Sequence, residues 1–271
     1  MKYIDFVNIR NGTESVRRFS RGNTLPLVCL PNALNMFAPQ TDSSRGPWYY
    51  HPKDRSFEGV RLTHQPSPWA GDFSYLCFLP EAGKLVTDPA LRWSGFRPEN
   101  TVLKPNVMEF DLLRYKTNFK LVPTECGAMM QIDASKCAEK PLFAIIPFNY
   151  QTEICVDTQN RTVYGYTCSY TEAPFRDDFK MYFVLRFDCD IDGIETQRIG
   201  DKAEAVGVFL AEKKYTVRGA TSFISAEQAK LNLQRELADK PFEELVDAAE
   251  NMWERLLSRL QIEADEKTKR T

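Results

Sequence analysis

Two histidines and two tryptophans gather in one short stretch of this 271-residue sequence, where their side chains could bind a sugar. Both histidines of the chain, His51 and His64, lie in the segment Trp48–Phe73 with two of its four tryptophans. Prolines stiffen the backbone between His64 and Trp69, and a glycine frees it just before Asp72. The segment therefore predicts a rigid loop that presents imidazole, indole and carboxylate groups.

Such a loop suits a sugar, because an indole ring stacks on apolar C–H faces while polar groups bond the hydroxyls. The alternative is a buried loop whose histidine and tryptophan side chains serve packing and hydrogen bonding. Composition leaves both interpretations open. A metal site at His51 and His64 is disfavoured, since no third ligand stands at a recognised spacing. The neighbouring charges predict an ion-pair network that shapes the loop, formed by Asp54, Arg55, Glu58 and Arg61.

The elements that must position this loop read as β-strands. Between residues 76 and 215, short runs with a two-residue period are separated by turn residues, which predicts an antiparallel β-sandwich. The clearest run is Phe179–Ile191, and the Asp192–Gly193 pair after it predicts a turn. Other strand-like runs are Pro141–Phe148, which is apolar throughout as a strand buried on both faces would be, and the pair Ile154–Asp157 and Val163–Tyr170.

The pattern changes to helical near Ser225. Ser225 and Gln228 form a capping box, and Pro241 suits the first turn of a second helix. An apolar stripe at helical spacing runs over Phe242–Leu260. We therefore expect a β-sandwich over residues 1–222 and a helical segment over 223–271. The second helix either folds back on the sandwich as a lid or links to a further domain that packs against it.

Composition excludes several function classes. The net charge of −2 with interspersed signs argues against nucleic acid as a partner. No run approaches the roughly 20 apolar residues that span a bilayer, so no membrane partner is expected. The N-terminus lacks the apolar region of a secretory signal. Seven scattered cysteines are typical of free thiols in a reducing compartment, so we expect a cytoplasmic protein. None of them forms a CxxC pair, so we expect no zinc site. We also expect a bacterial source.

Several segments, in order along the chain, carry a resemblance to a known family. Arg21–Thr41, Trp48–Phe73, Arg92–Leu113 and the pair Met181–Ile191 and Ser222–Leu237 are similar to the N-terminal domain of the glycoside hydrolase family 92 alpha-mannosidases. The sequence departs from the family at Pro31-Asn32-Ala33-Leu34, where Pro-Phe-Gly-Met is usual, and at Phe96-Arg97-Pro98.

The resemblance implies a β-supersandwich of the galactose-mutarotase type, followed by an α-helical linker. It also implies that loops of this domain complete the subsite for a terminal mannose. By position we carry over five substrate-binding residues. Trp48 or Trp69 would stack on the sugar, Asp72 would accept hydrogen bonds from two hydroxyls, and His64 and Asn23 would fix orientation.

In the resembled family, a C-terminal (α/α)6 barrel holds the catalytic carboxyl groups and the calcium ligands. No part of this chain matches that barrel, so we nominate no catalytic or metal residue and expect the chain alone to be inactive. The implied partners are a mannose-containing glycan and a helical catalytic domain packed on the Phe242–Leu260 helix. Two alternatives are a stand-alone carbohydrate-binding sandwich and a structural domain that self-associates through that helix.

Overall fold

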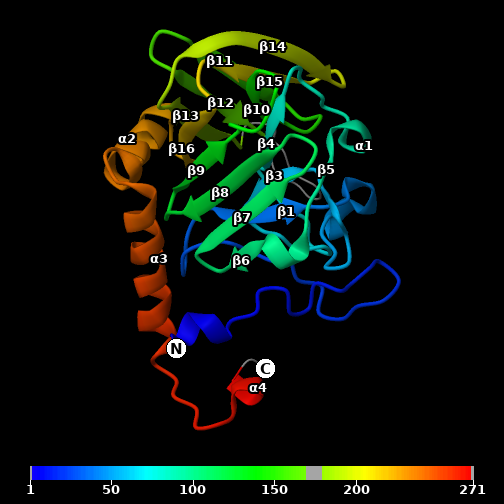
Figure 1. Cartoon of the computed structure of the whole chain (residues 1–271), viewed down its shortest axis with the longest axis vertical. Coiled ribbons are helices and arrows are strands. Elements are labelled where there is room, and N and C mark those ends of the chain that lie inside the picture. The colour runs from blue at the N-terminus through cyan, green and yellow to red at the C-terminus, as the bar shows by residue number, and fades with distance from the viewer. Residues whose placement is uncertain (1, 169–178, 270–271) are drawn as a thin grey trace.

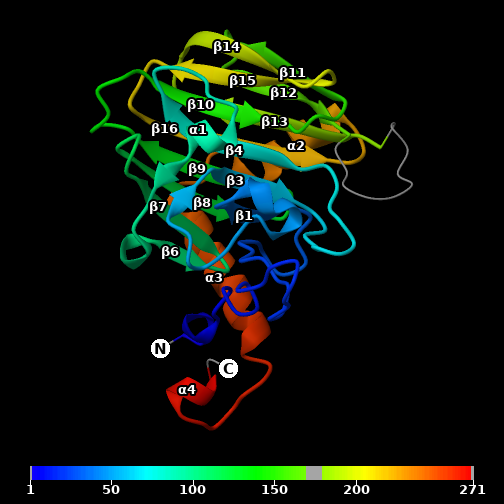
Figure 2. The same cartoon turned by 90° about the vertical axis from the view of Figure 1, so that its right-hand side faces the viewer.

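The computed structural model describes residues 2–168 and 179–269, and its core is two antiparallel β-sheets packed face to face (Figures 1 and 2). Phe143 and Phe187, one from each sheet, meet across the sandwich with ring centroids 5.8 Å apart. The inward side chains of both sheets form one apolar cluster. The predicted fold class is confirmed: the protein is mainly β, antiparallel, and followed by helices at its C-terminal end.

The loops that contain Trp48 and Trp69 connect strands at one edge of the six-stranded sheet. Its strand order is β1 (Met36–Gln40), β3 (Gly59–Thr63), β4 (Leu76–Ala82), β10 (Pro141–Ile146), β15 (Ala203–Leu210) and β14 (Ile191–Ile199). The order in the eight-stranded sheet is β11 (Thr152–Asp157), β12 (Thr162–Thr167), β13 (Met181–Phe187), β16 (Lys214–Ser222), β9 (Gly127–Asp133), β8 (Thr117–Pro123), β7 (Val107–Leu112) and β6 (Val102–Lys104). A small third pair joins β2 (Ser56–Phe57) to β5 (Ser94–Gly95).

The strand predictions hold in part. β10 is buried along its whole length between β4 and β15, as its continuous apolar run predicts. The run Phe179–Ile191 is not one strand: β13 ends at Phe187, and β14 begins at Ile191 in the opposite sheet. The turn predicted at Asp192–Gly193 is also wrong, because these residues lie inside β14 at a register shift. The run Val163–Tyr170 matches β12 up to Thr167, and its last two residues lie outside the described part.

Helices cover the outer face of the eight-stranded sheet. α2 (Ala226–Leu237) begins at Ser225, whose hydroxyl accepts the N–H of Gln228 as the capping pattern predicts. α3 (Phe242–Leu257) ends earlier than the apolar stripe that predicts it. Side chains of α2 and the first half of α3 form a second apolar cluster with the sheet, whereas Leu260 beyond α3 is 70% exposed. The helices therefore fold back on the sandwich, and the division at residue 222 stays a prediction. No helix in the described residues is long and apolar enough to span a membrane.

Shorter helices complete the chain. They are η1 (Tyr3–Phe6), η2 (Ser43–Trp48), α1 (Pro89–Arg92), η3 (Pro98–Asn100) and α4 (Glu266–Lys269). In both views η1 and α4 lie beyond the same end of the sandwich (Figures 1 and 2).

The N-terminal segment is clasped to the far end of α3. The carboxylate of Glu254 accepts the backbone N–H of Tyr3 at 3.1 Å and that of Ile4 at 2.6 Å. Ile4 is almost fully buried, and Lys104 pairs with Asp5 at 2.9 Å. One carboxylate thus satisfies the orphan amides at the start of η1 and fixes the N-terminus against α3.

Replacing Glu254 with alanine is expected to detach η1 and lower the free energy of unfolding by about 1–3 kcal/mol, because a buried amide loses its acceptor. Native-state hydrogen exchange should show faster exchange over residues 3–7 and little change in the sheets. Glu243→Ala, on the exposed face of the same helix, is the matched control. Unchanged hydrogen-exchange protection of the Ile4 amide in Glu254→Ala would contradict the proposed role of Glu254 in holding η1.

Candidate functional site

A hollow of about 240 Å³ opens beside the loops that precede and follow β3. We call it the Arg61 pocket. Its lining comes from several separate stretches of chain and includes Ser43, Tyr49, Arg61, Ser67, Tyr75 and Phe148. Of the five predicted site residues only Asp72 lines it directly, while chain neighbours of the other four, such as Leu25, Pro47 and Pro66, also form its wall. The loops that carry the predicted residues therefore border this pocket, although four of the five predicted side chains do not line it.

Three of the predicted residues form one contact chain. The indole N–H of Trp48 donates to Oδ1 of Asn23 at 3.1 Å, and the ring of Trp69 meets that of Trp48 nearly edge-on, with centroids 5.1 Å apart. Trp48 is only 7% exposed, whereas Trp69 is 61% exposed. Trp48 is thus a buried support, and Trp69 is the ring that offers a free face.

Asp72 holds its own loop together. Its Oδ1 accepts the backbone N–H groups of His64 at 3.1 Å and of Gln65 and Phe73 at 2.9 Å, and its Oδ2 accepts the hydroxyl of Thr63. A carboxylate that takes several N–H donors fixes the backbone around it. Asp72 therefore fixes the path of the loop that carries Trp69.

His64 is the other internal support of the loop. Its Nδ1 lies 3.1 Å from the carbonyl oxygen of Phe73, and its Nε2 lies 3.0 Å from Oδ1 of Asn35. Rings of Phe73 and Phe223 pack against it. Burial lowers the pKa of His64 to about 4, although the charge of Asp72 opposes this effect. The imidazole is therefore neutral near pH 7 and ties the loop to the β1 side of the sandwich.

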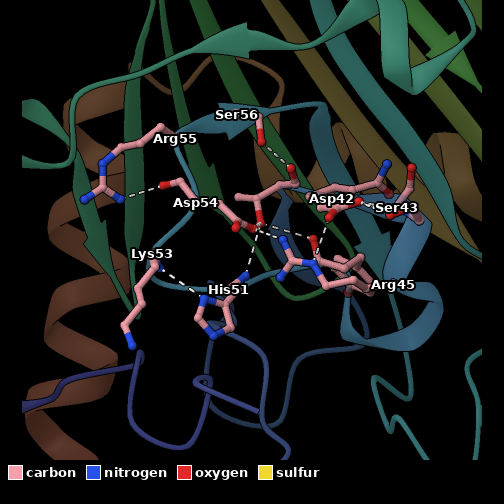
Figure 3. Close-up of polar contacts among 12 residues, drawn as sticks. Asp42, Ser43, Arg45, His51, Lys53, Asp54, Arg55 and Ser56 are labelled. Atoms are coloured by element: carbon pink, nitrogen blue, oxygen red, sulfur yellow. Dashed lines mark hydrogen bonds and ion pairs between the residues drawn. The ribbon is translucent and has the colours of Figure 1, made fainter. Parts of the chain in front are cut away.

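The loop that carries Trp48 is fixed by an arginine between two aspartates (Figure 3). In η2, Arg45 Nε lies 2.8 Å from Asp42, and Arg45 Nη2 pairs with Asp54. The hydroxyl of Thr41 also donates to Asp54. Burial raises the pKa of Asp42, but hydrogen bonds from Ser44 and Arg45 outweigh it, so the net pKa lies below the usual value.

The predicted network of Asp54, Arg55, Glu58 and Arg61 is wrong in its pairings. Asp54 pairs with Arg45, and Arg55 donates to the backbone carbonyl of Asp54. Glu58 instead accepts the Gln40 side-chain amide and the backbone N–H of Ser43, each at 2.9 Å. Proximity in sequence misleads here, because the amide of Gln40 from β1 lies between Glu58 and Arg61.

Arg61, which the sequence assigned to an ion-pair network, was not predicted as a residue of the site. It lies on β3, is only 6% exposed, and lines the pocket. Its guanidinium carbon lies 3.9 Å from the ring centroid of Tyr49 and 4.6 Å from that of Phe148. The available signal was a single charged residue inside the short strand Gly59–Thr63, which is buried throughout.

Metal binding finds no support in the described residues. Within them no group of three or more His, Cys, Asp or Glu side chains could hold a metal ion. His51 makes local hydrogen bonds. Its backbone N–H donates to the hydroxyl of Thr41, and its Nδ1 accepts the backbone N–H of Lys53.

Comparison with protein families gives one match that covers most of the chain. Residues 6–234 match the family model of the glycosyl hydrolase family 92 N-terminal domain. No curated protein matches the chain.

Solved structures agree in fold over the whole chain. An inverting mannosidase of family GH92 from Bacteroides thetaiotaomicron shares 29% identity at a TM-score of 0.91, covering 100% of this chain and 38% of that one. A family GH92 alpha-mannosidase from the same species shares 20% identity at a TM-score of 0.81, covering 100% of this chain and 39% of that one. This second likeness shows the fold alone. The chain thus spans about two fifths of the length of these solved structures.

Proposed function

The chain belongs to the glycosyl hydrolase family 92 N-terminal domains, and we propose that it completes the terminal-mannose subsite of an exo-acting, calcium-dependent alpha-mannosidase. The observation that carries the proposal is the pair of tryptophans beside the Arg61 pocket. A buried indole anchored to Asn23 supports an exposed indole whose free face can stack on a sugar ring.

The chemistry of hydrolysis belongs to the partner domain in this proposal. An inverting glycosidase needs two carboxyl groups about 6.5–9.5 Å apart, one as acid and one as base for a water. The carboxyl groups near the Arg61 pocket serve other roles: Asp72 holds loop amides, Asp54 pairs with Arg45, and Glu58 bonds Gln40. The domain would supply binding and orientation, and a helical barrel packed against α3 and its exposed extension would supply the acid, the base and the calcium ligands.

Replacing Trp69 with alanine is expected to weaken binding of methyl α-mannoside about tenfold or more, since sugar stacking on an indole is lost while the fold remains. Saturation-transfer NMR or calorimetry on the 271-residue chain would measure it. Tyr164→Ala removes an exposed aromatic ring, 38% exposed, from β12 of the eight-stranded sheet, and is the control. No detectable sugar binding by the native chain, or equal binding by Trp69→Ala, would overturn the proposal.

Catalysis offers a second test. The chain alone should not hydrolyse an aryl α-mannoside, and adding a family 92 catalytic barrel should restore turnover that a calcium chelator abolishes. Turnover by the isolated chain would contradict the division of roles.

A further inference from the structure

Arg61 is a buried cation without a direct carboxylate partner among the described residues. Its Nε and Nη2 donate to a single oxygen, Oε1 of Gln40, at 3.1 and 2.6 Å. A guanidinium carries five N–H groups, and the two bonds to Gln40 use two of them. The second Nη2 hydrogen and both Nη1 hydrogens are left to bond another group. They find no acceptor in the described part of the chain. Because Arg61 lines the Arg61 pocket, these N–H groups are available to donate to the acceptor oxygens of a ligand bound there.

The charge of Arg61 is already balanced inside the domain. The Nε2 of Gln40 donates to the carboxylate of Glu58, so one amide links the cation to an anion. The rings of Tyr49 and Phe148 also lie within cation–π distance of the guanidinium. What the site lacks is hydrogen-bond acceptors rather than negative charge, which favours neutral oxygen atoms as the ligand groups.

The shape of the pocket sets the size and character of the ligand. At about 240 Å³ it is smaller than the range of roughly 300–1,000 Å³ that holds drug-sized ligands, which suits one sugar ring. Tyr49, Tyr75 and Phe148 give it aromatic walls, and Ser43 and Ser67 add polar residues to the lining. Aromatic walls suit C–H faces, and a planar guanidinium fork suits two oxygens side by side.

We propose that Arg61 is a specificity-determining residue that binds two adjacent ring hydroxyls of a single hexopyranose in the Arg61 pocket. This inference rests on the proposed function and names its ligand more closely: a neutral sugar whose vicinal diol is unsubstituted. The aromatic contacts with Tyr49 and Phe148 and the two bonds to Gln40 hold the fork in place before the sugar arrives.

The test is a series of monodeoxy methyl α-mannosides, one for each hydroxyl, titrated into the native chain and into Arg61→Lys. In the native chain, loss of either of two neighbouring hydroxyls should weaken binding roughly tenfold or more, as a hydrogen bond from a charged donor is lost. Arg61→Lys should bind the complete sugar more weakly by a similar factor and should lose its discrimination against those two analogues. A merely structural role would weaken all analogues alike.

Arg97→Lys, on an exposed arginine, controls for the chemical change, and a thermal melt checks that Arg61→Lys is folded. If that variant does not fold, the deoxy series on the native chain still decides the matter. Equal affinity for all deoxy analogues, or loss at two hydroxyls that are not neighbours, would overturn the inference and leave the proposed function standing. So would tighter Arg61-dependent binding of inorganic phosphate or mannose 6-phosphate, which would reveal an anion site. Absence of any sugar binding would instead reject the proposed function.

Discussion

Trp48→Ala is expected to lower the free energy of unfolding by about 3–5 kcal/mol and to abolish sugar binding. The loss of stability follows because removal of a buried tryptophan leaves a cavity and removes the contacts of the groups around it. The side-chain oxygen of Asn23 loses its donor, and Trp69 loses the ring on which it rests. Chemical denaturation followed by fluorescence, together with the mannoside titration, would measure both effects.

Trp69→Ala is the matched comparison for this prediction. Its ring is 61% exposed, so its removal should cost no more than about 1 kcal/mol of stability, mostly the edge-on contact with Trp48. The two variants thus separate support from binding: one loses stability and binding, the other loses binding alone. Equal stability losses would show that the division of roles between the two rings is wrong.

Glu81→Gln should make the protein more stable than the native chain at alkaline pH, by about 3–5 kcal/mol near pH 8.5. Glu81 lies in β4 and is 1% exposed. Its Oε2 accepts the N–H of Val86 at 2.9 Å, but its buried Oε1 has no partner in the described residues. Burial raises the pKa of Glu81 to about 8, against the opposing effects of Val86, Arg92 and Arg114.

The sign follows from proton binding. Unfolded, the group titrates near 4.5, so between about pH 4.5 and 8 the folded state holds a proton that the unfolded state has released. The stability tied to this carboxyl is therefore complete below pH 4.5 and decreases as pH rises towards 8, by at most about 1.4 kcal/mol per pH unit. Glutamine imitates the protonated form and should remove that slope.

Denaturant unfolding from pH 5 to pH 9 would measure this difference. Glu99→Gln makes the same chemical change at an exposed position and should leave the pH profile parallel to that of the native chain. Parallel profiles for Glu81→Gln would mean that Glu81 is ionised in the folded state, contrary to this prediction.

The fold could be predicted where local patterns decide it. The all-apolar β10 and the Ser225 cap of α2 are fixed by burial on both faces and by one side-chain hydrogen bond, and both were predicted correctly. The passage from β13 to β14 was missed, because alternation continues across the point where the chain changes sheets. Periodicity reports which face is buried and not which sheet a strand joins.

The site was predictable as a region, and less so as a set of contacts. Scarce histidines and tryptophans marked loops that border the Arg61 pocket, and Asn23, Trp48 and Trp69 do come together. The substrate-binding roles of these residues, of His64 and of Asp72 stay predictions. Arg61 was assigned to an ion-pair network because its neighbours in sequence are acidic. Its actual partner, Gln40, comes from another strand, and only the three-dimensional pairing of β1 with β3 brings them together.

The clasp between Glu254 and the first residues also bears on the order of folding. Its hydrogen bond to Ile4 joins positions 250 apart in the sequence, so it cannot form until the ribosome has released almost all of this stretch. The sandwich can assemble during translation, whereas the leading residues must wait for the last long helix. Docking of this leading segment would then be the last step in the folding of the domain. In a nascent chain arrested before residue 254, the leading segment should remain undocked and accessible to protease.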